Sequence, residues 1–284
     1  MRARGRATIG LVAGGLVAAP VLIGIAYAGL AAVGLAGVGR AGAGGGRVFR
    51  VLGDPESWEA VWWSVRTAAA ATAIAAVAAV GVGLAFRGQA RGHRAAHLLS
   101  VLPLPIPHLV AAAAGVLLLS QSGVLARLAY AVGLINGPAQ MPLVVGDPAG
   151  VGFVLTLAWK EFPFLALVTF SLLATRGPAM EEAARTLGAT PRQTFRRVTM
   201  PMLSRGLLPA IIVVFIVIAG SYEAGALLSG SHPQPLPVLT YERYLDVDLS
   251  RRGDAYALTL LGLVIGVTAV ALHEWARAWS DDGG

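Results

Sequence analysis

Cysteine is absent from the 284 residues, and charged residues make up only 13% of them. Without thiols the chain can form neither a disulfide nor a thiolate metal site. Soluble proteins carry about a quarter of their residues as charged ones. Because 56% of this chain is hydrophobic and its mean hydropathy is +0.70, the sequence predicts an integral membrane protein.

Lysine is nearly absent as well, since Lys160 is the only one. A phosphate-binding P-loop needs Gly-Lys-Ser/Thr, whereas Lys160 follows Trp159 and precedes Glu161. The motifs of hydrolases and zinc peptidases are incomplete too: His273-Glu274, for example, lacks the second histidine of a zincin helix. The sequence therefore predicts no catalytic residue, no cofactor, no metal site and no ATP site of its own.

The net charge of +7 comes from basic residues that lie mostly in short loops between apolar runs. Membrane proteins carry excess arginine in such loops because it sets their orientation. This placement favours a bilayer as the partner and argues against nucleic-acid binding.

Six apolar runs are long enough to cross about 30 Å of hydrocarbon. The first follows three arginines and is about twice as long as a signal-peptide core, so we expect it to remain as an anchor. The predicted fold is all-α, a polytopic membrane protein with about six transmembrane helices. The runs cover residues 8–37, 61–86, 98–119, 151–175, 203–228 and 255–279.

Arginines without compensating acidic residues fall on alternate loops and mark one side as cytoplasmic. On this basis both termini and the polar loop 179–201 are expected inside. The sequence divides into an N-terminal anchor helix with an external glycine-rich loop, 1–60, and a transmembrane core, 61–279.

The loop 179–201 contains a polar island between two apolar runs. We expect a short helix over 180–187, a left-handed helix end at Gly188, and a second short helix that Thr190 caps and Pro191 begins. Two short helices at a sharp angle make a knob on which small and charged residues face a partner. An ordinary solvated hairpin is the alternative from spacing alone.

The island has the order Glu182-Ala183-Ala184, three residues, Gly188, nine residues, then Val198-Thr199-Met200-Pro201. This spacing resembles the cytoplasmic loop signature of the permease subunits of binding-protein-dependent ABC importers. The segment 222–244 resembles the corresponding segment in the polyamine, thiamine and ferric-iron importer group. The resemblance covers roughly residues 61–278.

The resemblance implies that Glu182, Ala183, Ala184, Gly188 and Pro201 couple the chain to a separate ATP-binding cassette ATPase. It also implies a second permease subunit, identical or homologous, and an extracytoplasmic solute-binding protein. With one such loop and no internal repeat, the chain forms half of a solute pathway. Its location would be the inner membrane of a prokaryote.

Ionisable residues also occur inside the spans. Lys160 and Glu161 lie in the fourth run and Glu223 in the outer half of the fifth. Such residues face a bundle interior or water, so Glu161 and Glu223 are candidates to line the solute path. Alternatively they neutralise arginines such as Arg66, or serve with Lys160 as an ion relay in a secondary transporter or channel.

A proline-rich segment, Leu102 to His108, begins the third run. Its three prolines at 103, 105 and 107 prevent a straight helix, so this span is either broken or begins late. His108 is expected to be a packed residue. The acidic residues near the path hint at a cationic solute such as a polyamine, but arginines balance them.

Overall fold

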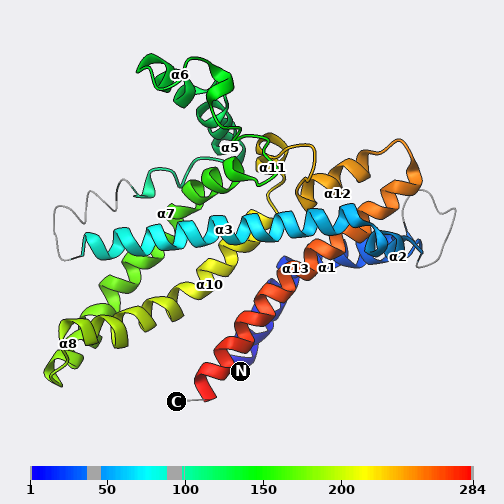
Figure 1. The fold of residues 1–284 in the computed structure, drawn as a ribbon. Helices are drawn as coiled ribbons and strands as arrows, with labels where there is room; N and C mark the ends of the chain where they lie inside the picture. The colour runs from blue at the N-terminus through cyan, green and yellow to red at the C-terminus, as the bar shows by residue number, and fades with distance from the viewer. Residues whose placement is uncertain (1, 37–45, 88–97, 99, 283–284) are drawn as a thin grey trace. The chain divides into compact units, whose positions relative to one another are not determined.

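The computed structural model describes residues 2–36, 46–87, 98 and 100–282 (Figure 1). Within these ranges the regular structure is helical throughout, and six helical segments are long and apolar enough to cross a membrane. The predicted all-α polytopic fold is confirmed. Most of the predicted glycine-rich loop falls at 37–45, outside the described residues.

The helices follow one another along the chain without strands between the described elements. In order they are α1 (Arg2–Ala32), α2 (Gly46–Gly53), α3 (Pro55–Ala85), α5 (His108–Leu119), α6 (Val124–Ala131), η1 (Pro138–Gln140), α7 (Val151–Thr175), α8 (Gly177–Thr186), α9 (Pro191–Thr194), η2 (Phe195–Thr199), α10 (Met200–Ala219), α11 (Tyr222–Leu228), α12 (Leu236–Leu245) and α13 (Leu249–Asp282).

The chain forms two compact units. One comprises residues 1–61 and 236–264, and the other comprises residues 62–235 and 265–284. We call them the smaller and the larger unit. The sequence-based boundary near residue 60 remains a prediction about domains.

The larger unit is built around α7. Helices α5, α10 and α11 pack against it, and its core includes Trp63, Phe153, Leu157 and Leu165. The edge of the Trp63 ring meets Phe153 with ring centroids 5.0 Å apart. Burial of such large side chains stabilises the unit where apolar lipid cannot drive helix association by itself.

A close approach of α5 to α7 depends on Gly115. A Cβ atom at this position would collide with the side chain of Thr156, with the Cγ2 atom only 2.9 Å away. Small residues allow membrane helices to approach in this way.

Two span boundaries differ from those expected. Helix α5 begins at His108, directly after the prolines, and residues 98, 100 and 101 before them are helical too, so the prolines interrupt helical structure in this run. The fifth run was expected to continue to residue 228, but α10 ends at Ala219 and an extended Ser221 separates it from α11. The extended backbone at Ser221 interrupts the helix although both flanks are apolar.

Candidate functional site

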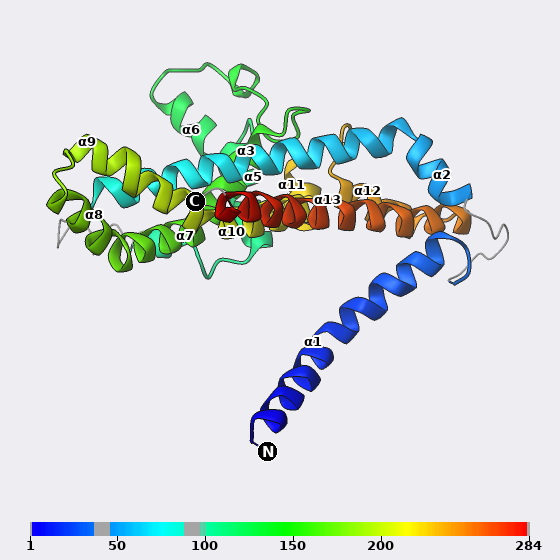
Figure 2. The ribbon, with the colours of Figure 1, turned by 90° about the horizontal axis from the view of Figure 1, so that it is seen from below.

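Helices α8 and α9 form a hairpin at one end of α7 and α10 (Figure 2). Gly188 lies between them with φ of +82°, in the left-handed region that favours glycine. Thr190 and Gln193 form a reciprocal capping box, in which the Gln193 side-chain oxygen accepts from the Thr190 N–H at 2.8 Å. These observations confirm the local predictions at Gly188 and Thr190.

The sequence predicted a separate short helix as the second arm of the hairpin. In the structure this helix is continuous with α10. Residues 191–219 are helical throughout, because α9 runs through the π-helical turn η2 into α10. The Met200 N–H donates to the Phe195 carbonyl, five residues back. The wider turn stands directly before Pro201, whose ring would clash with the Arg197 carbonyl in a regular α-helix.

The outward surface of the hairpin carries most of the residues that the sequence singled out. Glu182 and Ala183 are exposed and Ala184 is half-buried. Leu187 is 88% exposed, although it is a large apolar residue. Pro201 is half-buried in the first turn of α10. The hairpin thus combines small, apolar and acidic groups on an open surface.

A basic cavity of about 630 Å³ lies beside this surface on the second arm of the hairpin. It is lined by Thr190, Arg192, Gln193, Arg196 and Arg197. Like charges at this spacing repel one another, so an anionic group brought by a partner is favoured there.

Glu181 is buried, unlike its exposed neighbour Glu182. Its Oε2 atom lies 2.5 Å from the Arg87 Nη2 atom, and its Oε1 atom accepts a 2.6 Å hydrogen bond from the Thr199 hydroxyl. Arg185, one helical turn later, is 3.9 Å from the same carboxylate. Sequence reasoning missed this site, although consecutive helical residues point about 100° apart and so cannot both face one partner.

Burial and the neighbouring side chains have opposite effects on the pKa of the Glu181 carboxyl. Burial alone raises its pKa, but the hydrogen bonds from Arg87 and Thr199 and the charges of Arg87 and Arg185 outweigh burial. The pKa of Glu181 is therefore lowered from its ordinary value of 4.5. The carboxylate is the favoured form.

Within the spans, Glu161 is buried and its Oε1 atom lies 2.7 Å from the His108 Nε2 atom. His108 is thus more than a packed residue, since it joins the start of α5 to α7. Arg66, offered as a neutralising partner, instead donates to the carbonyl oxygens of Pro148 and Ala149 at 2.6 and 2.9 Å. Glu223 is exposed in the first turn of α11.

Lys160 is buried next to Glu161 in the sequence, only 6% exposed. Adjacent positions on a helix face different neighbours, and the structure pairs Glu161 with His108 rather than with Lys160. Among the described residues, the polar contact given for Glu161 is therefore with His108, a residue outside the Lys160, Glu161 and Glu223 set of the alternative hypothesis.

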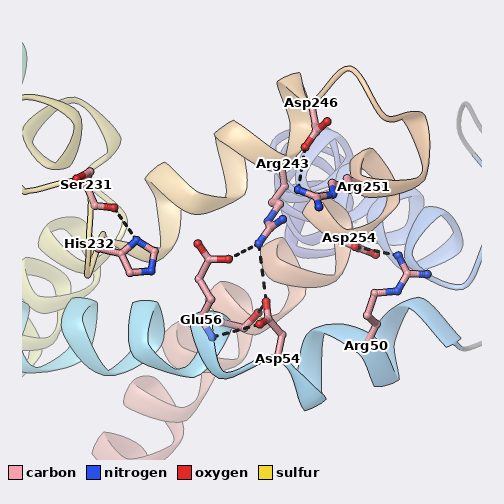
Figure 3. Close-up of polar contacts among 10 residues, drawn as sticks. Arg50, Asp54, Glu56, Ser231, His232, Arg243, Asp246, Arg251 and Asp254 are labelled. Carbon is pink, nitrogen blue, oxygen red and sulfur yellow. Dashed lines mark hydrogen bonds and ion pairs between the residues drawn. The ribbon is translucent and has the colours of Figure 1, made fainter.

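The smaller unit contains a polar cluster of its own (Figure 3). The Arg243 guanidinium pairs with Glu56 and lies 3.9 Å from Asp54. Nearby, Arg50 pairs with Asp254 at 3.2 Å and Arg251 with Asp246 at 3.5 Å, around a cavity of about 520 Å³. The opposite charges compensate one another, so the cluster joins α2, α3, α12 and α13 within the unit. Among the described residues, no group of acidic residues and histidines is arranged to hold a metal ion.

Comparison with known protein families identifies the family to which this chain belongs. Residues 71–280 match the family described as binding-protein-dependent transport system inner membrane component. The chain belongs to this family. It is a multi-pass membrane protein and the permease subunit of a binding-protein-dependent ABC importer, a transport subunit whose ATPase is a separate protein.

Relatives support the assignment over most of the chain. The molybdenum transport system permease protein ModB of Mycobacterium tuberculosis is 29% identical over 232 residues, covering 81% of this chain and 83% of the relative. A probable molybdenum ABC transporter permease protein of Haloferax volcanii is 30% identical over 204 residues, 69% of this chain and 70% of the relative. The sulfate transport system permease protein CysW of Synechocystis is 33% identical over 127 residues, 43% of this chain and 46% of the relative.

The fold is similar to that of a solved transporter. A crystal structure of a bacterial alginate ABC transporter, in complex with alginate pentasaccharide-bound periplasmic protein, contains a chain with a TM-score of 0.66 and 17% identity. The match covers 94% of this chain and 91% of that chain. The resemblance to the polyamine, thiamine and ferric-iron group is not confirmed, since these relatives are named for molybdenum and sulfate.

Proposed function

We propose that the α8–α9 hairpin is the element through which this permease is driven by its ATPase. The observation that carries the proposal is the exposed island on α8, where Glu182 and Ala183 accompany the 88% exposed Leu187. A large apolar side chain left in water is stabilised when a partner covers it. Gly188 and Pro201 set the directions in which the chain leaves the island.

The chain supplies half of a solute pathway. It has one hairpin of this kind and no internal repeat, so a second permease subunit, identical or homologous, completes the pathway. Two ATPase subunits and an extracytoplasmic solute-binding protein complete the importer. Glu161 and Glu223 are the proposed path residues, and both termini lie in the cytoplasm with the hairpin.

The proposed solute is a tetrahedral oxyanion of the molybdate or sulfate type. The names of the relatives support this class. Within the chain, Glu161, one of the two proposed path residues, already has a polar partner in His108.

Uptake of labelled molybdate, sulfate and spermidine by cells carrying the complete importer tests the solute class. Molybdate or sulfate should be taken up in an ATP-dependent manner, and excess unlabelled oxyanion should compete. Inhibition of uptake by excess spermidine, with no inhibition by molybdate or sulfate, would refute the oxyanion assignment. The hairpin proposal would not be affected.

A charge reversal at Glu182 tests the hairpin. Glu182 lies in the middle of α8, outside the first turn where the helix dipole acts, and its side chain is exposed, so Glu182→Lys should scarcely change the melting temperature of the isolated permease. Binding to the ATPase should be affected much more, because removing one partner of a desolvated charge pair costs about 2–5 kcal/mol of binding free energy. Glu182→Lys should therefore weaken ATPase co-purification and uncouple ATP hydrolysis from uptake.

The matched control is Glu59→Lys, which reverses an exposed glutamate in the other unit. This variant should bind the ATPase and transport at wild-type levels. Full ATPase binding and uptake by Glu182→Lys would show that the island does not couple the two subunits.

A further inference from the structure

We propose that Glu181 is a positioning residue that clamps the coupling hairpin to two membrane spans at once, to α3 through Arg87 and to the start of α10 through Thr199. The inference rests on the proposed coupling function of the hairpin and adds to it a route by which the motion enters the membrane. Glu182 contacts the ATPase, and Glu181 transmits the displacement.

One carboxylate makes both connections. Its two oxygen atoms have different partners, with Oε2 bound to the Arg87 guanidinium at 2.5 Å and Oε1 to the Thr199 hydroxyl at 2.6 Å. Arg87 stands directly after the last turn of α3, and Thr199 is the last residue of η2 before α10. A shift of α8 therefore strains both contacts together.

The carboxylate is enclosed, whereas the Arg87 side chain is 30% exposed. The Glu181 side chain is 8% exposed, and Thr199 is fully buried. Charge-assisted hydrogen bonds shielded from water are about twice as strong as neutral ones, and they tolerate little change in geometry. A connection of this kind is stiff enough to carry a displacement rather than absorb it.

Local packing leaves room for the arginine. Gly177, the first residue of α8, is buried, and a Cβ atom there would lie 3.3 Å from the Arg87 Nη2 atom. The guanidinium occupies space that a side chain at 177 would restrict. The start of α8 is thus shaped around the same ion pair.

No other side chain duplicates this connection among the described residues. The hydrogen bonds and ion pairs that join α8 side chains to other elements all run through Glu181, since the Thr186 hydroxyl bonds within α8 to the Glu182 carbonyl and Arg185 reaches only Glu181. Removing the carboxylate leaves α8 attached by its apolar contacts and by the chain itself.

The experiment compares Glu181→Gln with Glu182→Gln in the complete importer, reconstituted with ATPase and binding protein. Glu181→Gln should assemble with the ATPase at wild-type level and continue to hydrolyse ATP, but solute uptake per ATP should fall by about tenfold or more. The double variant Glu181→Arg, Arg87→Glu should recover at least a third of the wild-type ratio, because it restores the pair in reversed order. Normal uptake per ATP in Glu181→Gln, or no recovery in the double variant, would overturn the clamp.

Spin labels measure the clamp directly, because the chain has no cysteine to be removed first. Labels at exposed Ala85 and Ala179 should give a narrow distance distribution in the otherwise wild-type chain and a broad one with Glu181→Gln. Equal widths in both proteins would refute the clamp even if Glu181→Gln lowered uptake for another reason.

Failure of this inference is distinguishable from failure of the proposed function. If Glu182→Lys releases the ATPase while Glu181→Gln transports normally, the hairpin couples the subunits but Glu181 does not clamp it. If neither variant changes assembly or uptake per ATP, the hairpin itself is not the coupling element.

Discussion

Two adjacent glutamates on α8 have opposite environments. Glu181 is enclosed by Arg87, Arg185 and Thr199, whereas Glu182 is open to a partner. The residue type and the helix are the same, so the difference comes from the 100° between consecutive side chains. One position belongs to the permease interior and the other to its surface.

The lowered pKa of Glu181 predicts how the stability of the folded permease depends on pH. Because its folded pKa lies below the ordinary value of 4.5, the carboxylate stabilises the folded state at pH values above 4.5, and this stabilisation is lost as pH falls through the folded pKa. The melting temperature of wild type should exceed that of Glu181→Gln at pH 7, and the gap should narrow below pH 4.5. Melting curves of the purified permease in detergent at several pH values measure this.

Glu182→Gln serves as the control for the pH series. Its melting temperature should follow that of wild type at every pH, since the exposed carboxylate has no enclosed partner. A gap between wild type and Glu181→Gln that stays constant from pH 7 to pH 3.5 would contradict the assignment of the ion pair.

We expect glycine to be required at position 188 because of its backbone conformation, and not because a side chain there would collide with neighbouring atoms. Its φ is +82°, and nothing lies within 4 Å of a Cβ atom placed there. Valine in the left-handed region costs of order 1–3 kcal/mol, whereas asparagine tolerates this region. Gly188→Val should abolish uptake without loss of membrane insertion, and Gly188→Asn should keep most of it; equal uptake by the two variants would argue against a backbone requirement.

At the scale of the elements, apolar runs predicted the spans well, because hydrophobic length is a property of the sequence alone. The break between α10 and α11 was not predictable from hydropathy, since Gly220 and Ser221 stand between two apolar flanks. The continuity of α9 with α10 was missed for a related reason. Pro191 indicated a helix start correctly, but nothing in the sequence between 195 and 201 showed that a π turn would carry the helix past Pro201.

The same limit applies to the candidate site. Glu182, Ala183, Ala184 and Gly188 could be found because their mutual spacing is short and regular. The pairing of Glu181 with Arg87, and of His108 with Glu161, joins residues that are far apart in the sequence. A single sequence does not show which distant residues are in contact, so these pairs could be identified only from the structure.

The packing of α5 on α7 gives an element-scale prediction. Gly115→Ala places a methyl group against Thr156, and overpacking of this kind costs about 1–3 kcal/mol. The melting temperature should fall, and the double variant Gly115→Ala, Thr156→Ala should recover most of the loss. Gly81→Ala in α3, where nothing lies within 4 Å, should not lower it. A similar decrease for both single variants would mean that Gly115 is not a specific contact.

At the scale of the whole molecule, the six spans and the arginine distribution predict which segments face each side. Val247, 94% exposed in the turn before α13, should be extracytoplasmic, and Leu187 on the hairpin cytoplasmic. Single cysteines at these positions, in a chain that has none, should react differently with an impermeant thiol reagent. Val247→Cys should be labelled in intact cells and Leu187→Cys only after permeabilisation; labelling of both in intact cells would contradict the six-span topology.

The unbroken helix from Pro191 to Ala219 has a mechanical consequence. At 1.5 Å per residue its 29 residues measure about 43 Å, longer than the hydrocarbon layer is thick. Pro209 and the π turn are positions at which such a helix bends; if the helix turns as one piece, a tilt of about 5° at the hairpin displaces its far end by about 4 Å. An ATPase that moves the hairpin by a small rotation would thus shift α10 at the opposite membrane surface by more than the diameter of a water molecule, with no refolding of the helix.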